Sequence, residues 1–233
     1  MRVAAMNWGD VARRAEIDDR CILPIGSIEQ HAFLSLATDT ILAEKVSVEA
    51  AEPLGVPVFP VLAYGLAGSF VDFPGTVSLR LSTWCGLIED LLEGMWRSGF
   101  RRITIVNGHG GNGPVGTLAA EWLDRRRGSQ VKIHDWWRAP KTWAKVMEID
   151  REASHASWME NFPWTRIAGA PEPDETKPEV DRGALARIDP GARRALLGEG
   201  NYQGRFRRPD TDMEAIWRVA VAETRAVIEG PWS

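Results

Sequence analysis

Acidic and histidine side chains are concentrated in three short segments of this sequence. The first segment contains Glu29, His31 and Asp39 and directly follows an apolar run at residues 21–25. Because Glu29 and His31 are two positions apart, both side chains point to one face of an extended segment, and a short loop must bring Asp39 back to them. An isolated Glu-x-His pair is more often a surface feature than a metal site, so the other two segments decide the interpretation.

The second and third segments offer further ligands of the same kind. His109 follows residues 103–106, whose β-favouring side chains indicate a buried strand, and the glycines around it allow a sharp turn and a close approach to a ligand. Open α/β sheets place their binding crevices at the carboxyl ends of strands, where His109 is predicted to lie. The third segment contributes His155 and Glu160. Three such segments indicate one shared metal site.

Strand and helix patterns alternate along the chain and would position these segments. Apolar and β-branched runs predict strands, and amphipathic repeats predict helices, on the spacing of parallel crossover units in a layered α/β sheet. The expected strands are residues 21–25, 56–62, 103–106 and 131–135, and the expected helices are residues 39–51, 87–96, 114–127, 141–151 and 211–229. Asp39 is thus expected at a helix N-terminus, where the helix dipole favours an anionic carboxylate.

Four ordered motifs resemble those of the creatininase (creatinine amidohydrolase) family. They are Gly26-Ser-Ile-Glu-Gln-His31 with Thr38-Asp39, Phe73-Pro-Gly-Thr-Val-Ser78, Asn107-Gly-His-Gly-Gly-Asn112 and His155-Ala-Ser-Trp-Met-Glu160. The resemblance spans residues 23–160, whereas the C-terminal third carries no motif that aligns. It implies an α/β fold, a three-layer α/β/α sandwich with a mostly parallel central sheet, together with a two-metal hydrolytic centre and a homo-oligomer that is a hexamer or smaller.

The resemblance also implies a role for each candidate side chain. Asp39 would bridge two metal ions, whose remaining ligands would be Glu29 with His109 and His31 with Glu160. His155 would move protons for the leaving group, which suits an imidazole with a pKa near neutrality. The structural alternative for His155 is a buried histidine bonded to the backbone.

The ligand chemistry limits which metals fit. Mixed carboxylate and imidazole ligation without thiolates suits zinc, manganese or iron(II) better than magnesium or calcium. Two such cations about 3.5–4 Å apart can share a water, lower its pKa and polarise a carbonyl, which equips a site for hydrolysis. The glycine-rich loop at residues 108–111 could instead cradle a phosphate, but no Lys-Ser/Thr follows it. A non-catalytic metal-binding module is the other alternative, and it would have no use for so many converging ligands.

Departures from the family motifs bear on the substrate. Ser69 and Phe70 occupy positions where the family commonly has Glu-His, and Trp158 and residues 161–164 replace small and hydroxyl residues. The residues predicted to contact substrate are Ser69, Gly110, Trp158, Asn161 and Trp164. We therefore expect a hydrolase that opens a small cyclic polar carbonyl compound, with a slight preference for C–C hydrolysis of 3-dehydro-scyllo-inosose in inositol catabolism. The alternative is C–N hydrolysis of a creatinine-like or formamidopyrimidine-like amide.

Composition describes an ordinary soluble globular protein. A chain of 233 residues with 44% hydrophobic and 26% charged residues is expected to form a single domain. The net charge of −4 argues against nucleic-acid binding, and no apolar run is long enough to cross a membrane. The lone cysteines Cys21 and Cys85 are expected to be free, buried thiols in a reducing cytoplasm.

Five of the eleven tryptophans surround the third motif, and two roles are open for them. They either pack in a core or interface, or they line a pocket. These tryptophans are Trp136, Trp137, Trp143, Trp158 and Trp164.

Overall fold

A sheet of three parallel strands, ordered β1-β2-β3, lies at the centre of the molecule. The computed structural model describes residues 1–232. The strands are β1 (Arg20–Ile25), β2 (Arg102–Asn107) and β3 (Gln130–Asp135), and Ile103 of β2 is paired with Cys21 on one side and Val131 on the other. After their first residue β1 and β2 are buried throughout, as expected for parallel strands covered on both faces.

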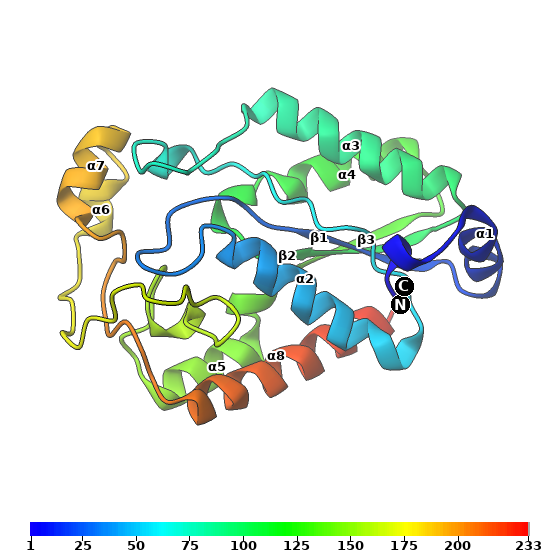
Figure 1. Cartoon of the computed structure of the whole chain (residues 1–233). Helices are drawn as coiled ribbons and strands as arrows, with labels where there is room; N and C mark the ends of the chain where they lie inside the picture. The colour runs from blue at the N-terminus through cyan, green and yellow to red at the C-terminus, as the bar shows by residue number, and fades with distance from the viewer. Residues whose placement is uncertain (233) are drawn as a thin grey trace.

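Helices cover both faces of this sheet (Figure 1). One face carries α3 (Leu81–Arg97) and α4 (Val115–Arg125). The opposite face carries α2 (Thr38–Ala51), α5 (Pro140–Ile149) and α8 (Asp210–Glu229), and α1 (Trp8–Ile17) lies at the edge near the two termini. The predicted three-layer α/β/α sandwich is confirmed, and the sheet is entirely parallel.

The period of two along β1 divides the apolar side chains between two cores. Cys21, Leu23 and Ile25 pack with the buried side chains of α3 and α4, whereas Ile22 packs with those of α2, α5 and α8. A slip of one residue in the pairing of β1 would exchange these two sets, so both cores fix the register that positions the loop after Ile25.

The predicted strand at residues 56–62 is extended but forms only single bridges to β1. Val58 bridges to Ile22 and Leu62 bridges to Ile25, both in parallel orientation. Pro57 and Pro60, like Pro24 in β1, have no N–H to donate, which limits hydrogen bonding along this edge of the sheet.

The C-terminal third places two short helices beyond the carboxyl ends of the strands. They are α6 (Arg182–Leu185) and α7 (Pro190–Leu197), and Figure 1 shows them at the end of the molecule opposite the two termini. The side chains of Asp181 and Asp189 cap them by accepting backbone N–H bonds. Their apolar side chains pack on the loop that precedes α3, in a small cluster of Phe70, Phe73, Leu185 and Leu197.

Short 3-10 turns complete the chain and carry several residues of interest. Among them η3 (Gly68–Phe70), η4 (Gly110–Asn112), η5 (Trp136–Arg138) and η6 (Trp158–Glu160) carry residues that line the site described below. The others are η1 (Val3–Ala5) and η2 (Glu52–Leu54). Both cysteines are free, with Cys21 buried and Cys85 only half-buried. No helix within residues 1–232 is long and apolar enough to cross a bilayer.

Candidate metal centre

The loops at the carboxyl ends of the strands enclose a cavity of about 290 Å³. Glu29, Asp39, His109 and Glu160 all contribute to its lining, so the three predicted segments meet in one place. Glu29 lies in the loop after β1, and Asp39 lies at the start of α2. His109 follows β2, and Glu160 lies in η6. The position agrees with the rule that open parallel sheets bind ligands beyond their carboxyl ends.

Asp39 lies between two histidines at the floor of this cavity. Its Oδ1 is 3.1 Å from His31 Nε2, and its Oδ2 is 3.0 Å from His109 Nδ1. Ser27 Oγ also donates a hydrogen bond of 2.8 Å to Oδ2. Asp39 lies in the first turn of α2, as predicted, where the helix dipole stabilises its negative charge.

Two groups of potential ligands share the Asp39 carboxylate. One is Glu29, Asp39 and His109, the other is His31, Asp39 and Glu160, and the ligand atoms within each group lie within 4.8 Å of one another. The side chain of Glu160 approaches His31 Nε2 to 3.7 Å, and that of Glu29 approaches His109 Nδ1 to 3.2 Å. Each group has the residue types that bind a divalent transition metal.

The buried carboxylates of this cluster need positive charge to balance them. Glu29, His31 and Asp39 are at most 3% exposed, and burying several carboxylates together is costly unless positive charge balances them. The buried Oε2 of Glu29 has no hydrogen-bond partner among the described residues, so this oxygen is left for a ligand that the chain itself does not supply. The donor set therefore fits metal ions.

The pKa values of the cluster also reflect this excess of buried negative charge. Burial raises the pKa of Glu160 to about 7 and also raises that of Glu29. Burial would lower the pKa of His31, but the carboxylates of Asp39 and Glu160 raise it to about 10. In the absence of cations, protons therefore collect on these side chains, and metal binding must displace them.

Backbone carbonyls fix which ring nitrogen of each histidine is free for a metal. His109 Nε2 lies 3.1 Å from the Leu66 carbonyl and donates to it, which leaves the Nδ1 lone pair facing Glu29 and Asp39. His31 Nδ1 lies 3.2 Å from the Glu29 carbonyl and donates to it, which leaves Nε2 facing Asp39. Such outer hydrogen bonds orient metal-ligating histidines and raise their basicity.

Asparagines and glycines hold the loop that carries His109. Asn107 accepts the backbone N–H of His109 at 3.1 Å and donates 2.8 Å to its carbonyl. A Cβ at Gly111 would lie 2.2 Å from the Leu66 carbonyl oxygen and 2.4 Å from His109 Nε2, so only glycine allows this close approach.

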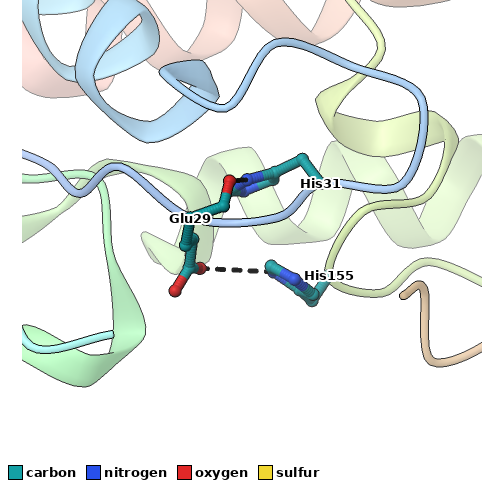
Figure 2. Close-up of side chains that lie close together, drawn as sticks. All are labelled: Glu29, His31 and His155. Carbon is teal, nitrogen blue, oxygen red and sulfur yellow. Dashed lines mark hydrogen bonds and ion pairs between the residues drawn. The ribbon is translucent and has the colours of Figure 1, made fainter. Parts of the chain in front are cut away.

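His155 lies beside His31, with the ring centroids 4.6 Å apart, and it faces the carboxylate of Glu29 (Figure 2). Its Nδ1 is 3.8 Å from Glu29 Oε1, and its ring stacks on Phe70 at 4.8 Å with an interplanar angle of 10°. Burial, with the nearby charge of His31, lowers the pKa of His155 well below its usual value, so the ring is neutral.

Gln30 sets the tautomer of His155. The Gln30 amide oxygen accepts the Ala32 N–H at 3.1 Å, and the amide nitrogen donates to the Gly200 carbonyl at 3.1 Å. This orientation directs the same nitrogen at His155 Nε2, 2.9 Å away, which must accept. The proton of the neutral ring is therefore on Nδ1. Glu29, His31 and His155 also lie close enough to form a third ligand group. In this group, however, His155 presents its Nδ1–H to the other two residues, and an N–H has no lone pair to bind a metal.

Comparison with known proteins decides the family. A family model described as creatininase, creatinine amidohydrolase, matches residues 4–163. The chain belongs to the creatininase family. A crystal structure of creatinine amidohydrolase (creatininase) superposes with a TM-score of 0.80 at 24% identity, covering 100% of this chain and 98% of that one, and therefore supports the fold. A structure named "Creatininase Mn" superposes with a TM-score of 0.72 at 24% identity, covering 98% and 97%.

Curated relatives in the creatininase family differ in their named activities. Creatinine amidohydrolase of Pseudomonas putida is 34% identical over 46% of this chain and 44% of its own length. A mycofactocin precursor peptide peptidase of Mycolicibacterium smegmatis is 42% identical over 42% of each chain. The 3-dehydro-scyllo-inosose hydrolase of Thermotoga maritima is 28% identical over 45% of this chain and 34% of its own length. The chain thus spans less than half the length of each of these relatives.

Of the residues predicted to contact substrate, Ser69 and Gly110 line the cavity. Trp158, Asn161 and Trp164 are not part of this lining, and each has other contacts. The Trp158 side chain is fully buried and donates to the Glu152 carbonyl. The Asn161 amide is occupied by the Phe206 carbonyl and the Arg166 guanidinium.

Trp164 faces away from the cavity for a related reason. Its ring stacks on Phe162 at 5.2 Å, contacts Trp217 at 4.9 Å and lies under the Lys45 ammonium. It therefore packs against the core between α2 and α8 rather than against a substrate.

The aromatic wall of the cavity comes from other residues. Trp137 and Trp143 line it, so the pocket role left open for the five tryptophans applies to these two. Tyr202 and Arg182 also line it, and they come from the C-terminal third, where no motif marked them. Ser69 and Phe70 contribute a hydroxyl and the ring that stacks on His155.

Proposed function

We propose that this chain is a metal-dependent hydrolase that cleaves an amide C–N bond in a small molecule or a short peptide. The observation that carries the proposal is the pair of buried ligand groups that share Asp39 at the floor of a cavity, beside a neutral imidazole. A module that only binds metal would not need His155 held by Gln30 and Phe70 at the same cavity.

The metal would be held by residues from all three segments. Glu29, Asp39 and His109 would bind one divalent ion, and His31, Asp39 and Glu160 would bind a second. Zinc and manganese are supported by structural neighbours named "Zn-Zn type" and "Creatininase Mn", and iron(II) is compatible with the same donors. When bound, such ions lower the pKa of a coordinated water and polarise a carbonyl.

The residues around the metals would orient the substrate. His155 presents its Nδ1–H toward the cavity and would donate a hydrogen bond to the amide group of the substrate, because the N–H of a neutral imidazole serves as a hydrogen-bond donor. Trp137 and Trp143 form an aromatic wall that would exclude water from one side of the substrate, and Ser69 offers a hydroxyl.

An amide is favoured over an oxidised inositol for two reasons. The residues that suggested a polyhydroxylated ring, Trp158, Asn161 and Trp164, lie outside the cavity lining. The two relatives of higher identity are named an amidohydrolase and a peptide peptidase, whereas the inosose hydrolase is 28% identical. C–C hydrolysis of 3-dehydro-scyllo-inosose is therefore our second candidate.

Metal analysis followed by a comparative assay tests the proposal. The protein loaded with zinc or manganese is assayed with creatinine, a formamidopyrimidine, short peptides and 3-dehydro-scyllo-inosose. Glu160→Gln should lose one equivalent of metal and at least about 100-fold in turnover, because an amide is a poor replacement for an anionic ligand. Full metal content and full turnover in this variant would show that Glu160 is not a ligand. Metal binding without turnover of any compound would favour a binding module.

We also propose that the protein is a homo-oligomer of six or fewer subunits and acts in the cytoplasm. The oligomer is an expectation from the family resemblance, and the two free thiols support a reducing compartment. Light scattering of the purified protein measures the mass of the assembly.

A further inference from the structure

A second compartment lies beside the metal cavity, on the side of the C-terminal third. It has a volume of about 330 Å³ and shares four lining residues with the metal cavity: Ser69, Phe70, Arg182 and Tyr202. The two compartments are therefore neighbours, lined in part by the same four side chains.

Helices α6 and α7 form the outer side of this compartment. Leu185 and Leu197 contribute its apolar surface and pack with Phe70, which also stacks on the ring of His155. The family motifs end before these helices, and Figure 1 shows them as a separate layer at this end of the molecule. The compartment is therefore built from a part of the chain whose purpose the motifs do not explain.

Two guanidinium groups give this compartment a positive character. Arg182 lies over the Tyr202 ring at 5.7 Å, and its ion pair with Glu179 is long, at 3.8 Å, between side chains that are 53% and 65% exposed. Such an exposed pair contributes little and is easily replaced. Arg193 donates its Nε–H to the Leu185 carbonyl at 2.7 Å, and within residues 1–232 it forms no ion pair with a carboxylate.

The charged side chains of the two compartments differ. Arg182 lines both, but the metal cavity also contains the three carboxylates of Glu29, Asp39 and Glu160, whereas the second compartment adds Arg193 and has no acidic side chain in its lining. Guanidinium groups bind carboxylates through paired, charge-assisted hydrogen bonds. The flat rings of Phe70 and Tyr202 would flank the atoms that connect such a carboxylate to the reacting amide.

We propose that Arg182 and Arg193 bind a carboxylate of the substrate, so that the preferred substrate is an amide bearing a carboxylate a few bonds from the cleaved C–N bond, as at the end of a peptide. This inference rests on the proposed amide hydrolysis and specifies its substrate class.

Matched pairs of compounds test this preference. N-acetylglycine, N-acetyl-β-alanine and N-acetyl-γ-aminobutyrate are each compared with their neutral N-methylamides on the metal-loaded protein. The wild type should prefer the anionic member of at least one pair. In Arg182→Gln/Arg193→Gln the ratio of kcat/KM between anionic and neutral members should fall about 10- to 100-fold, mainly through KM, because a hydrogen bond to a charged group contributes about 1.5–3 kcal/mol.

A matched control removes a neighbouring positive charge. Arg187 follows α6 but lines neither compartment, so Arg187→Gln should leave the ratio unchanged. An equal fall in Arg187→Gln would mean that the general positive field of this end, and not the compartment, sets the preference, and would overturn the proposal. The single variant Arg182→Gln serves if the double variant fails to fold.

Equilibrium binding separates this proposal from the proposed hydrolysis. Levulinate is the non-hydrolysable ketone analogue of N-acetylglycine, and 5-hydroxy-2-pentanone is a neutral counterpart. Levulinate should bind the metal-loaded protein more tightly than the alcohol, and the double variant should lose at least about tenfold of that affinity. Unchanged levulinate binding in the variant would overturn the carboxylate site, whatever the assays show. Arginine-dependent levulinate binding without hydrolysis of any amide would retain the carboxylate site and refute the proposed reaction.

Discussion

Gly200 lies outside the cavity lining, but the variant Gly200→Ala should alter the hydrogen bonding of His155 by displacing Gln30. Gly200 has a φ of +112°, and a Cβ there would lie 1.7 Å from the Gln30 amide oxygen. Gly198 has a φ of +61°, and no heavy atom lies within 4 Å of the Cβ position. Both alanine variants therefore carry a cost of backbone strain of about 1–3 kcal/mol, but only Gly200→Ala must displace Gln30.

The displacement of Gln30 sets the difference between the two variants. Its amide makes three hydrogen bonds, to Ala32, Gly200 and His155. At about 1 kcal/mol each, their loss should make Gly200→Ala about 2–3 kcal/mol less stable than Gly198→Ala. For a domain of this size that difference lowers the melting temperature by about 4–12 °C.

Thermal unfolding and turnover measure the two effects together. Gly200→Ala should also lower kcat at least about tenfold, because His155 loses the donor that fixes its tautomer. In a Gln30→Ala background the clash is absent, so the added Gly200→Ala change should cost no more than Gly198→Ala does. Equal stability of Gly198→Ala and Gly200→Ala in the wild-type background would refute the role of Gln30, as would purely additive effects in the double-variant cycle.

Two further predictions concern the loop of His109 and a buried histidine. Gly111→Ala should lower metal affinity about 10- to 100-fold in a metal titration, because the new Cβ would collide with the Leu66 carbonyl that orients His109. Gly116→Ala in α4 is the control, since its Cβ would meet no heavy atom within 4 Å, and it should retain metal in the same titration. Burial lowers the pKa of His134, so the unfolded chain binds this proton more tightly than the folded protein and stability declines as the pH falls below about 6.5. His134→Gln should therefore lose less stability between pH 7 and pH 5 in urea unfolding, and an identical loss would show that this histidine does not contribute.

Sequence reasoning located the candidate ligands because their positions follow from local rules. His109 ends a buried strand, and Asp39 begins a helix, so parallel pairing of β1 and β2 necessarily brings their side chains to one edge. The glycines beside His109 likewise predicted a close backbone approach, which Gly111 makes to Leu66. The three-layer fold followed from the alternation of strands and helices together with the motifs.

Side-chain direction within a turn could not be predicted in the same way. Trp158 and Glu160 are two residues apart in η6, yet the turn sends Trp158 into the core and Glu160 toward the cavity. Arg182 and Tyr202 reach the cavity only because the C-terminal helices pack on Phe70. The prolines at residues 57 and 60 interrupt pairing beside β1, a detail that the hydrophobic pattern of that segment does not reveal.

The spread of the ligands along the chain also determines when a metal can first be captured during synthesis. The group of Glu29, Asp39 and His109 requires strands from positions 20 and 102 to pair, and the second group is incomplete until residue 160 has left the ribosome. Such long-range pairing forms slowly, so the nascent chain has no preformed pair of sites to offer. Uptake of the proposed ions would thus report completed tertiary structure, and a cell starved of the metal would accumulate chains that are fully translated but unloaded.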